Sequence, residues 1–264
     1  MIATPPIVKK LFDRFPLTTY EHAGLPLRSR ERQVEIPTLL VYAYRGQTIH
    51  PDCLLWETLL QIHGTENFKS LASSPHASVS GLPLLLLPSG GKVHAAKLDE
   101  WAGIDPLTME QKVFRVMLNA NIRRAYLFTM YMEPRNAGLA SRLFIDGDVA
   151  WPASLLVRHS TRSSVHEVLA GGLATYYSKE EIYADADAAW AALSALLGND
   201  DYFASPPGLL DAAVFSYTHL ILSLPLDFSA RDIRISLSQY KNLIAHHERI
   251  DQLRSQSNIE LRQN

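Results

Sequence analysis

Cys53 is the residue whose type and position could support covalent chemistry, and it is the single cysteine of the sequence. It stands two residues after Pro51, in the expected first turn of a helix, where the helix dipole can stabilise a thiolate. Leu54, Leu55 and Trp56 follow it, however, and free cysteine is among the most buried residue types. The pattern therefore favours a small buried apolar residue over a nucleophile. A lone cysteine also excludes an intrachain disulfide and a cysteine-based metal site, which fits a reducing compartment or a surface facing the cytosol.

Two other motifs match known site signatures only in part. The run Gly90-Gly91-Lys92-Val93 lacks the upstream glycine and the Ser/Thr of a phosphate-binding loop, so it is interpreted as a hairpin turn. His246 and His247 are adjacent, which places them on different faces of a helix, unlike the i, i+4 pair of a zinc site. We therefore predict no metal site. Three further histidines are isolated in sequence and stay unassigned: His159, His166 and His219.

Asp211 is the one formal charge in an apolar run from Leu209 to Leu224. Apolar residues fall on every side of the expected helix, which in a soluble protein indicates a helix buried all round. Gly208 is a permissible N-cap, and a carboxylate three residues later can accept backbone N–H bonds and complement the helix dipole. We therefore interpret Gly208 and Asp211 as structural residues and expect no catalytic role for either.

The first elements of the chain predict a mixed α/β domain at residues 38–104. Short apolar runs bounded by turn residues predict four strands and two helices, in the order β, α, β, β, β, α. This order contains one βαβ crossover followed by a hairpin. The strands are expected at 38–43, 68–72, 81–87 and 92–95, with the loop 44–50 after the first, and the helices at 51–63 and 97–102.

The rest of the chain predicts an arm and a helical domain. Residues 1–37 alternate proline, glycine and charge without a sustained period, which indicates an extended arm. Residues 105–264 show the helical period throughout and are expected to form an all-helical domain. Its helices are expected at 108–133, 139–145, 151–169, 179–197, 209–224, 229–237 and 240–253.

Composition limits the partners of the chain. With 25 basic and 27 acidic residues the net charge is −2, so no global field recruits nucleic acid or anionic lipid, although a local basic groove stays open. No segment approaches the roughly 18 uninterrupted apolar residues needed to cross a bilayer, and the start of the chain lacks the features of a secretory signal. We therefore expect any membrane association to be peripheral or through a partner.

Several segments, in this order and spacing, resemble the metaxins, a branch of the glutathione-transferase fold. The resemblance covers roughly residues 38–252, and the shared order makes it more specific than any one motif. It implies a glutathione-transferase-like fold: an α/β, thioredoxin-like N-terminal domain followed by an all-α C-terminal domain. The segments that carry it are Ile49–Leu54 (IHPDCL), Tyr183–Trp190 (YADADAAW), Leu196–Gly198, Asp201–Ser205, Leu209–Phe215 (LLDAAVF) and Tyr240–Ile250 (YKNLIAHHERI).

The metaxin resemblance also implies a function and partners. It implies a non-enzymatic peripheral subunit on the cytosolic face of the mitochondrial outer membrane, within the sorting and assembly machinery for β-barrel proteins. Such a subunit holds the integral β-barrel subunit beside a second metaxin-like subunit. It also helps to receive β-barrel precursors through their C-terminal sorting signal. A translation- or signalling-associated scaffold of the same fold is a third, less specific alternative.

The glutathione-transferase fold implies an enzymatic alternative as well. In such enzymes a Tyr, Ser or Cys near the end of the first strand lowers the thiol pKa of glutathione, and Tyr44 and Cys53 are the candidates here. Glutathione-binding members also carry an acid and a serine after the fourth strand, where a helix N-terminus holds the γ-glutamyl carboxylate. The corresponding residues, His94-Ala95-Ala96, supply neither group. We therefore expect no glutathione and no other cofactor.

Pro83 matches the proline that thioredoxin-like domains keep before the third strand, often in cis. In such domains this proline exposes the backbone of the preceding residue, here Leu82, to pairing with an extended peptide. The structural interpretation of Leu82 and Pro83 is favoured, and a peptide groove beside them is the alternative.

Overall fold

A four-stranded sheet and the helix α2 open the described part of the chain. The computed structural model describes residues 34–64, 68–73, 81–144, 153–170, 177–224 and 233–263. Most of the predicted arm therefore lies outside the described residues. The strand order is β4-β1-β5-β6, with β1 parallel to β4 and antiparallel to β5, and β5 antiparallel to β6. The strands are β1 (Thr38–Val41), β4 (Lys69–Ala72), β5 (Leu84–Leu86) and β6 (Lys92–His94).

The βαβ crossover runs through α2 (Pro51–His63), which confirms the predicted helix. Proline at its first position and Gly64 in the left-handed region at φ 58° mark its two ends. Ten of its thirteen residues are buried, because the helix packs against β1 on one side and against the helix α9 (Leu209–Ser223) on another. After β6 the chain forms the short turn η2 (Ala95–Lys97) and the helix α3 (Leu98–Ala102).

The predicted loop at 44–50 is in part a small hairpin, which corrects the sequence interpretation. β2 (Ala43–Tyr44) pairs antiparallel with β3 (Gln47–Thr48). Arg45 and Gly46 connect them with φ values of 51° and 81°, and positive φ at both central residues suits the right-handed twist of a hairpin. Arginine is uncommon at positive φ, so the dipeptide carried no turn signal in the sequence.

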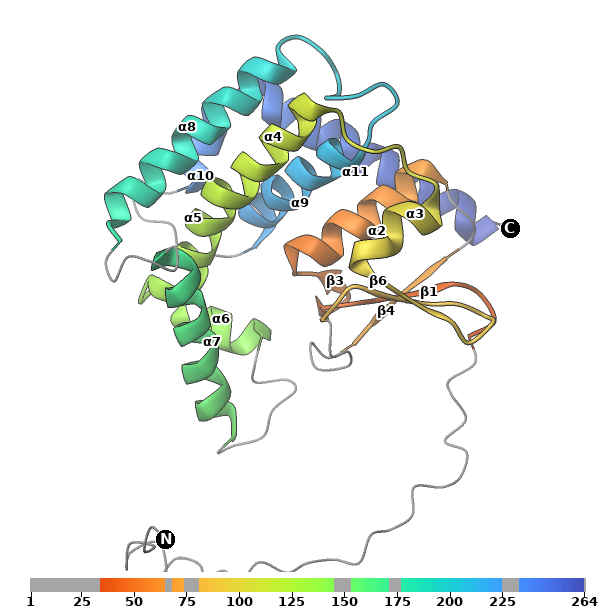
Figure 1. Cartoon of the computed structure of the whole chain (residues 1–264), viewed down its shortest axis with the longest axis horizontal. Helices are drawn as coiled ribbons and strands as arrows, with labels where there is room; N and C mark the ends of the chain where they lie inside the picture. The colour runs from red at the N-terminus through yellow and green to blue at the C-terminus, as the bar shows by residue number, and fades with distance from the viewer. Residues whose placement is uncertain are drawn as a thin grey trace, which may run out of the picture. The chain divides into compact units, whose positions relative to one another are not determined.

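The helical half contains one long helical rod and a set of separate helices (Figure 1). The rod runs from Met109 to Met132, which confirms one continuous helical segment, but two stretches of it are wound as π-helix. Thr108 and Gln111 cap its start reciprocally, at 3.2 and 3.1 Å. The parts are α4 (Met109–Met117), η3 (Leu118–Ile122), α5 (Arg123–Leu127) and η4 (Phe128–Met132). The other helices are α6 (Ala137–Phe144), α7 (Ala153–Ala170), α8 (Lys179–Leu197), α9 (Leu209–Ser223), α10 (Ile233–Ser238) and α11 (Lys241–Gln263).

Helix α9 lies at the centre of this assembly and joins the two halves of the fold. It packs against α2 of the sheet half and against α4, α5, α10 and α11 of the helical half. Eleven of its fifteen residues are buried, Asp211 among them, which confirms a helix that is covered on all sides. Among the described residues, no helix is both long and apolar enough to cross a bilayer.

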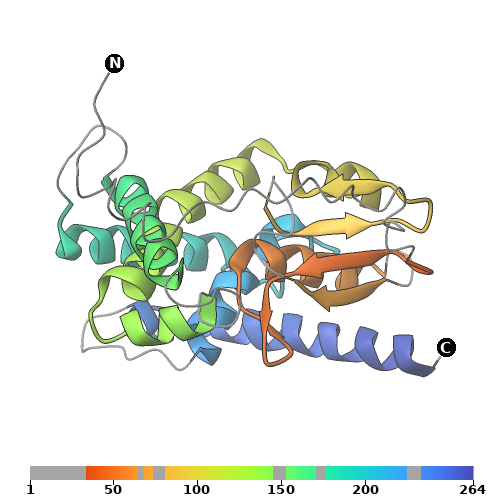
Figure 2. The same ribbon diagram turned by 90° about the horizontal axis from the view of Figure 1, so that it is seen from below.

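Helix α11 is longer than the sequence predicted. We expected it to end at Leu253, where the apolar period stops, but it continues to Gln263. Figure 2 shows the added turns running alongside the sheet half to the C-terminus. Arg254, just past the expected end, bonds to α2 through Gln61, and this contact supports the continuation.

Candidate functional site

Cys53, the candidate nucleophile, is a fully buried thiol. Its side chain is 0% exposed, and its Sγ accepts a long hydrogen bond from the Tyr42 backbone N–H at 3.5 Å. Burial raises the pKa of the Cys53 thiol to about 12, because the thiolate would lose its hydration in the core. The group is therefore a neutral thiol at physiological pH, and a neutral thiol is a poor nucleophile.

Tyr44, the second candidate, lies in the β2–β3 hairpin, half-buried at the edge of the core. The Arg45 guanidinium carbon is 5.3 Å from the centroid of the Tyr44 ring, a cation–π contact at a partly exposed site. The structure thus puts Tyr44 in a surface hairpin and Cys53 inside the core, in different environments. The buried Cys53 is not an activated thiol.

The helix start that would hold a glutathione carboxylate is occupied by the chain's own acids. Ala95 and Ala96 form the turn before α3, and Asp99 and Glu100 lie in the first turn of α3. Asp99 Oδ1 accepts the Glu100 backbone N–H at 2.9 Å, so a carboxylate of the protein already complements the positive end of this short helix. Ala95 and Ala96 have no hydroxyl group that could hold a γ-glutamyl carboxylate before this helix.

The Leu82–Pro83 peptide bond is cis, and it immediately precedes β5. Leu82 is half-buried and packs against the core, while Pro83 is buried. Leu84, the next residue along, is already paired with Leu40 on one side and His94 on the other. An extended peptide that pairs with the Leu82 backbone would therefore bind at the end of β5, before its first paired residue. The peptide groove beside Leu82 and Pro83 stays a prediction.

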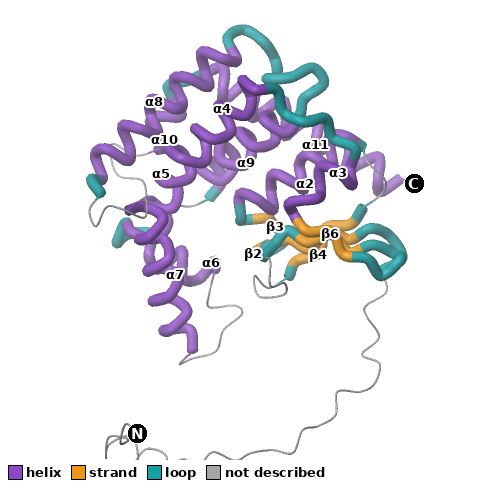
Figure 3. Tube along the Cα trace, viewed as in Figure 1, coloured by secondary structure: helices purple, strands orange, loops and turns teal. Residues whose placement is uncertain are grey.

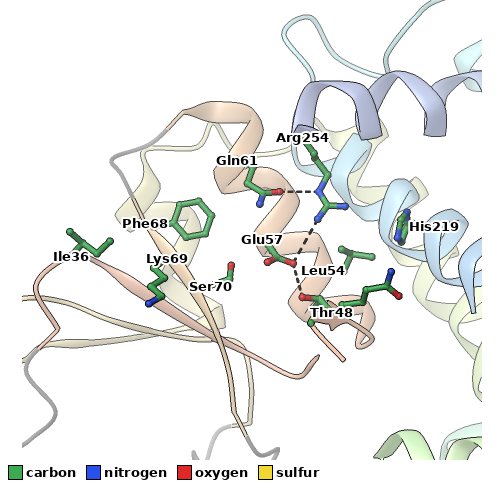
Figure 4. Close-up of a pocket in the computed structure, with 12 residues that line it drawn as sticks. Ile36, Thr48, Leu54, Glu57, Gln61, Phe68, Lys69, Ser70, His219 and Arg254 are labelled. Carbon is green, nitrogen blue, oxygen red and sulfur yellow. Dashed lines mark hydrogen bonds and ion pairs between the residues drawn. The ribbon is translucent and has the colours of Figure 1, made fainter. Parts of the chain in front are cut away.

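A pocket of about 730 Å³ lies elsewhere, along the outer strand β4 (Figure 4). Figure 4 shows Arg254 reaching from α11 between Gln61 and Glu57 of α2, and Thr48 pointing at the same carboxylate. Arg254 Nε donates to Gln61 Oε1 at 2.9 Å, and Thr48 Oγ1 donates to Glu57 Oε2 at 2.7 Å. The lining residues come from the sheet half, α9 and α11: Ile36, Gly46, Gln47, Thr48, Leu54, Glu57, Gln61, Phe68, Lys69, Ser70, His219 and Arg254.

The charges at the back of this pocket are balanced within the protein. Arg254 lies 3.8 Å from Glu57, and its guanidinium carbon is 5.2 Å from the Phe215 ring centroid. Burial and the neighbouring Arg254 lower the pKa of His219 to about 4, so this imidazole is neutral at pH 7 and is hydrogen-bonded to His247 at 3.2 Å. The pocket can hold a ligand by shape and hydrogen bonding. Its described residues include no activated nucleophile.

Asp211 is the centre of a buried polar cluster that ties three segments together. Its carboxylate accepts the backbone N–H groups of Gly208 at 2.9 Å and Phe203 at 2.8 Å. His246 Nε2 of α11 lies 3.0 Å from Asp211 Oδ1, and because an ionised carboxylate only accepts, this nitrogen is the donor. Both side chains are 0% exposed. The sequence did not identify His246 as the partner of Asp211, since the spacing between the two residues carries no periodic signal.

A second pocket, of about 610 Å³, is bordered by one basic face of α7. Basic side chains recur there at helical spacing, and Met132 and Tyr177 close the other side. The His166 and Tyr177 rings meet edge-on with centroids 5.1 Å apart. The sequence left His159 and His166 unassigned, although their spacing from the arginines would have placed them on one face. The α7 residues of this pocket are Arg158, His159, Arg162, Ser163 and His166.

No group of three or more His, Cys, Asp or Glu side chains that could hold a metal ion occurs within the described ranges. In particular, His246 is engaged by Asp211, and His247 by His219. Each of these histidines therefore takes part in the packing of α9 against α11.

Comparison with known proteins identifies the fold. The sequence profile of the family "Glutathione S-transferase, C-terminal domain" matches residues 186–250, which span α8 to α11. A glutathione S-transferase of Ceriporiopsis subvermispora, solved with glutathione, superposes with a TM-score of 0.55 and 13% identity, covering 83% of this chain and 97% of its own. A beta-etherase from Sphingobium sp. strain SYK-6 gives 0.53 and 13%, covering 85% and 99%. No curated protein matches the sequence significantly.

These likenesses confirm a glutathione-transferase-like fold, with a mixed α/β N-terminal region and a helical C-terminal domain. At 13% identity they define the fold alone. Fold does not carry activity with it, so the function has to be argued from the residues at the site.

Proposed function

We propose that this chain is a non-enzymatic peripheral subunit of the mitochondrial outer-membrane sorting and assembly machinery for β-barrel proteins. In this proposal it is of the metaxin type and most like the 35-kDa subunit of the fungal machinery. It docks on the integral β-barrel subunit from the cytosolic face, beside a second metaxin-like subunit. It also helps to receive β-barrel precursors through their C-terminal sorting signal.

The non-enzymatic part of the proposal is supported by the residues at two positions that a glutathione transferase uses: the group that activates the thiol of glutathione and the helix start that binds its γ-glutamyl carboxylate. Where a transferase needs an activated thiol-handling group, Cys53 is a buried thiol with a pKa near 12. Where it needs an acid and a hydroxyl after the fourth strand, the chain has His94, Ala95 and Ala96. A glutathione-transferase-like fold with these residues supports a protein that works by surface complementarity.

The metaxin part of the proposal is supported by where the resembling segments lie. They fall on the N-terminal half of α2, on α8, on α9 and on α11; α9 packs against α2 and α11, and α11 also packs against α8. These segments include Asp211 itself and His246, the two partners of the buried pair. The resemblance therefore covers residues that determine this arrangement of helices.

Co-purification tests the proposal directly. The tagged full chain, expressed in a fungal cell and isolated from detergent-solubilised mitochondrial outer membranes, is expected to bring down the β-barrel subunit and a second metaxin-like subunit. The purified chain is expected to bind a peptide carrying a C-terminal β-barrel sorting signal and not a scrambled peptide of the same composition. Recovery as a lone protein without either interaction would contradict the proposal.

The enzymatic alternative is tested with the same preparation. The chain is expected to pass through immobilised glutathione and to show no thiol conjugation with a general electrophilic substrate. Conjugation that is abolished by Tyr44→Phe or Cys53→Ser would establish the enzyme instead. A photoreactive residue placed at Leu82 tests the peptide groove, because a bound sorting-signal peptide should then be captured there.

A further inference from the structure

Helix α7 differs from its neighbours in how little of it the protein covers. Of its eighteen residues, three of those whose side chains are described are buried: Ser154, Val165 and Leu169. It packs chiefly against η4 and α5. Figure 3 shows α7 extending beyond the end of α5, on the side away from α8. Most of its surface is therefore available to a partner.

The exposed surface of α7 combines large apolar side chains with positive charge. Leu155 and Leu156, in its first turn, are 54% and 75% exposed. From Leu155, the basic residues follow at positions i+3, i+4, i+7 and i+11, so all lie on the face of the helix that carries Leu155. They are Arg158, His159, Arg162 and His166, and each is exposed.

This face has little negative charge to neutralise it. Glu167 is the one acid of α7, and no carboxylate lines the pocket that this face borders among the described residues. Arg158 has a partner within the protein, so the argument rests on Arg162, which makes no ion pair to any described residue. The hydroxyl groups of Ser163 and Tyr177 border the same pocket and can donate to a phosphate oxygen.

We infer that α7 is a lipid-contacting helix, whose basic, leucine-bearing face docks on a bilayer surface rich in anionic phospholipid. Phospholipid headgroups supply phosphate to Arg162 and to the neighbouring pocket, and the acyl boundary accepts Leu155 and Leu156. Basic residues clustered on a helix attract anionic headgroups, and exposed leucines on the same helix can enter the acyl boundary. This contact needs no protein partner, so it stands or falls separately from the docking on the β-barrel subunit.

Vesicle flotation with the purified full chain tests the inference. We expect the chain to float with vesicles of phosphatidylcholine containing about one third phosphatidylinositol, and not with phosphatidylcholine alone, at about 50 mM salt. Raising the salt to about 300 mM should weaken the binding, since the Debye length shortens. Equal flotation with neutral and anionic vesicles would overturn the inference.

Matched variants identify the face. Arg162→Glu should weaken vesicle binding about 10- to 30-fold, because it removes one attractive charge and adds a repulsive one, while Arg162→Lys should stay within about twofold. Lys112→Glu makes the same charge change at an exposed position of α4 and should leave binding unchanged. An effect of Lys112→Glu equal to that of Arg162→Glu would contradict a specific role for α7.

The leucines are tested in the same way. The double change Leu155→Ser and Leu156→Ser should weaken binding about tenfold, because both side chains enter the acyl boundary. Val113→Ser, at a residue of α4 that is 65% exposed, is the matched control and should have no effect. Saturable binding of inorganic phosphate without any flotation would assign the pocket to a soluble anion and overturn the lipid contact. Urea midpoints equal to that of the parent chain would show that each variant is folded.

Discussion

Helices α9 and α7 belong to the same helical half and show opposite relations to solvent. In α9 eleven of fifteen residues are buried, and the one charge, Asp211, has three hydrogen-bond donors around it. In α7 leucines, arginines and histidines face solvent on one side, and the helix packs chiefly against one neighbouring rod. The comparison indicates that α9 stabilises the fold, whereas the exposed face of α7 is available to bind a partner.

The difference has a thermodynamic consequence. Removing buried atoms from α9 reduces apolar burial and leaves cavities or unsatisfied polar groups. Each of these lowers the free energy of unfolding by about 1 kcal/mol or more. Changing exposed atoms of α7 alters little in the folded state relative to the unfolded chain. Stability measurements should therefore respond to α9 and to its contacts, and binding measurements should respond to α7.

The largest expected effect is that of Asp211→Ala. This change leaves the His246 imidazole and the Gly208 and Phe203 N–H groups without their acceptor in the core. We expect the free energy of unfolding to fall by about 3–5 kcal/mol, above the 0.5–2 kcal/mol of a simple cap, because one partner of a buried pair is removed. Urea denaturation measures this.

The matched control is Asp201→Ala, which removes an acid that is 71% exposed and paired with Arg249 at 3.3 Å. It should change the free energy of unfolding by less than about 1 kcal/mol. Normal stability of Asp211→Ala together with lost partner assembly would show that Asp211 acts in binding and not in folding.

The next effect is expected at the contact of α11 with α2. Arg254→Ala removes the hydrogen bond to Gln61 and the ion pair with Glu57, whose side chain is 11% exposed. We expect a loss of about 2 kcal/mol in the free energy of unfolding, because among the described residues the largely buried Glu57 carboxylate would keep only the Thr48 hydroxyl. Arg249→Ala serves as the control at a more exposed position of the same helix. An equal decrease in the free energy of unfolding for the two variants would mean that the contact of Arg254 with α2 stabilises the protein no more than the exposed contact of Arg249 does.

Acid should destabilise the α9–α11 contact through His219. Its folded pKa is lowered to about 4, chiefly by burial, from an ordinary value of 6.5. As the pH falls below 6.5, His219 becomes protonated in the unfolded chain, whereas in the folded protein it stays neutral until about pH 4. The free energy of unfolding therefore decreases between these two pH values. The loss from His219 is about 2 kcal/mol between pH 7.5 and 5.

The measurement is the free energy of unfolding by urea at both pH values, for the parent chain and for His219→Gln. The variant has no titrating group at this position, so its stability should fall by about 2 kcal/mol less over the same window. An identical acid dependence of parent and variant would contradict the assignment to His219.

The smallest effect is expected for Leu156→Ala in α7. Leu156 is 75% exposed, so the change should alter the free energy of unfolding by no more than about 0.5 kcal/mol. Leu220→Ala in α9, at a residue that is 1% exposed, should lower it by about 2–5 kcal/mol. Comparable losses for the two leucines would break the contrast between α7 and α9.

Local signals in the sequence predicted much of the fold. Proline at the start of α2, Gly64 after it, and the apolar period of α9 are properties of neighbouring residues, and the helices appeared as expected. The hairpin at Arg45 and Gly46 and the final turns of α11 were missed. Arginine is uncommon at positive φ and so gives no turn signal, whereas the polar end of α11 is supported by the contact of Arg254 with the distant Gln61.

For the candidate sites, too, the sequence indicated local properties of residues but not contacts between distant residues. The chemical types of Cys53 and Asp211 and the lack of an acid or hydroxyl at Ala95-Ala96 could be read from the chain itself. That His246 satisfies Asp211 across thirty-five residues, or that Arg254 reaches Glu57 of α2, could not. Such contacts have no sequence period, since they arise where helices from distant parts of the chain cross.

The sequence by itself determined the fold class, the burial of α9 and the structural role proposed for Asp211, because apolar periodicity and capping act over a few residues. The tertiary structure decided how far burial raises the pKa of the Cys53 thiol, and that Arg162 and Leu155 both face solvent. A pKa depends on the surroundings of a group, and exposure depends on which neighbours a helix finds. Both are set when the chain has packed.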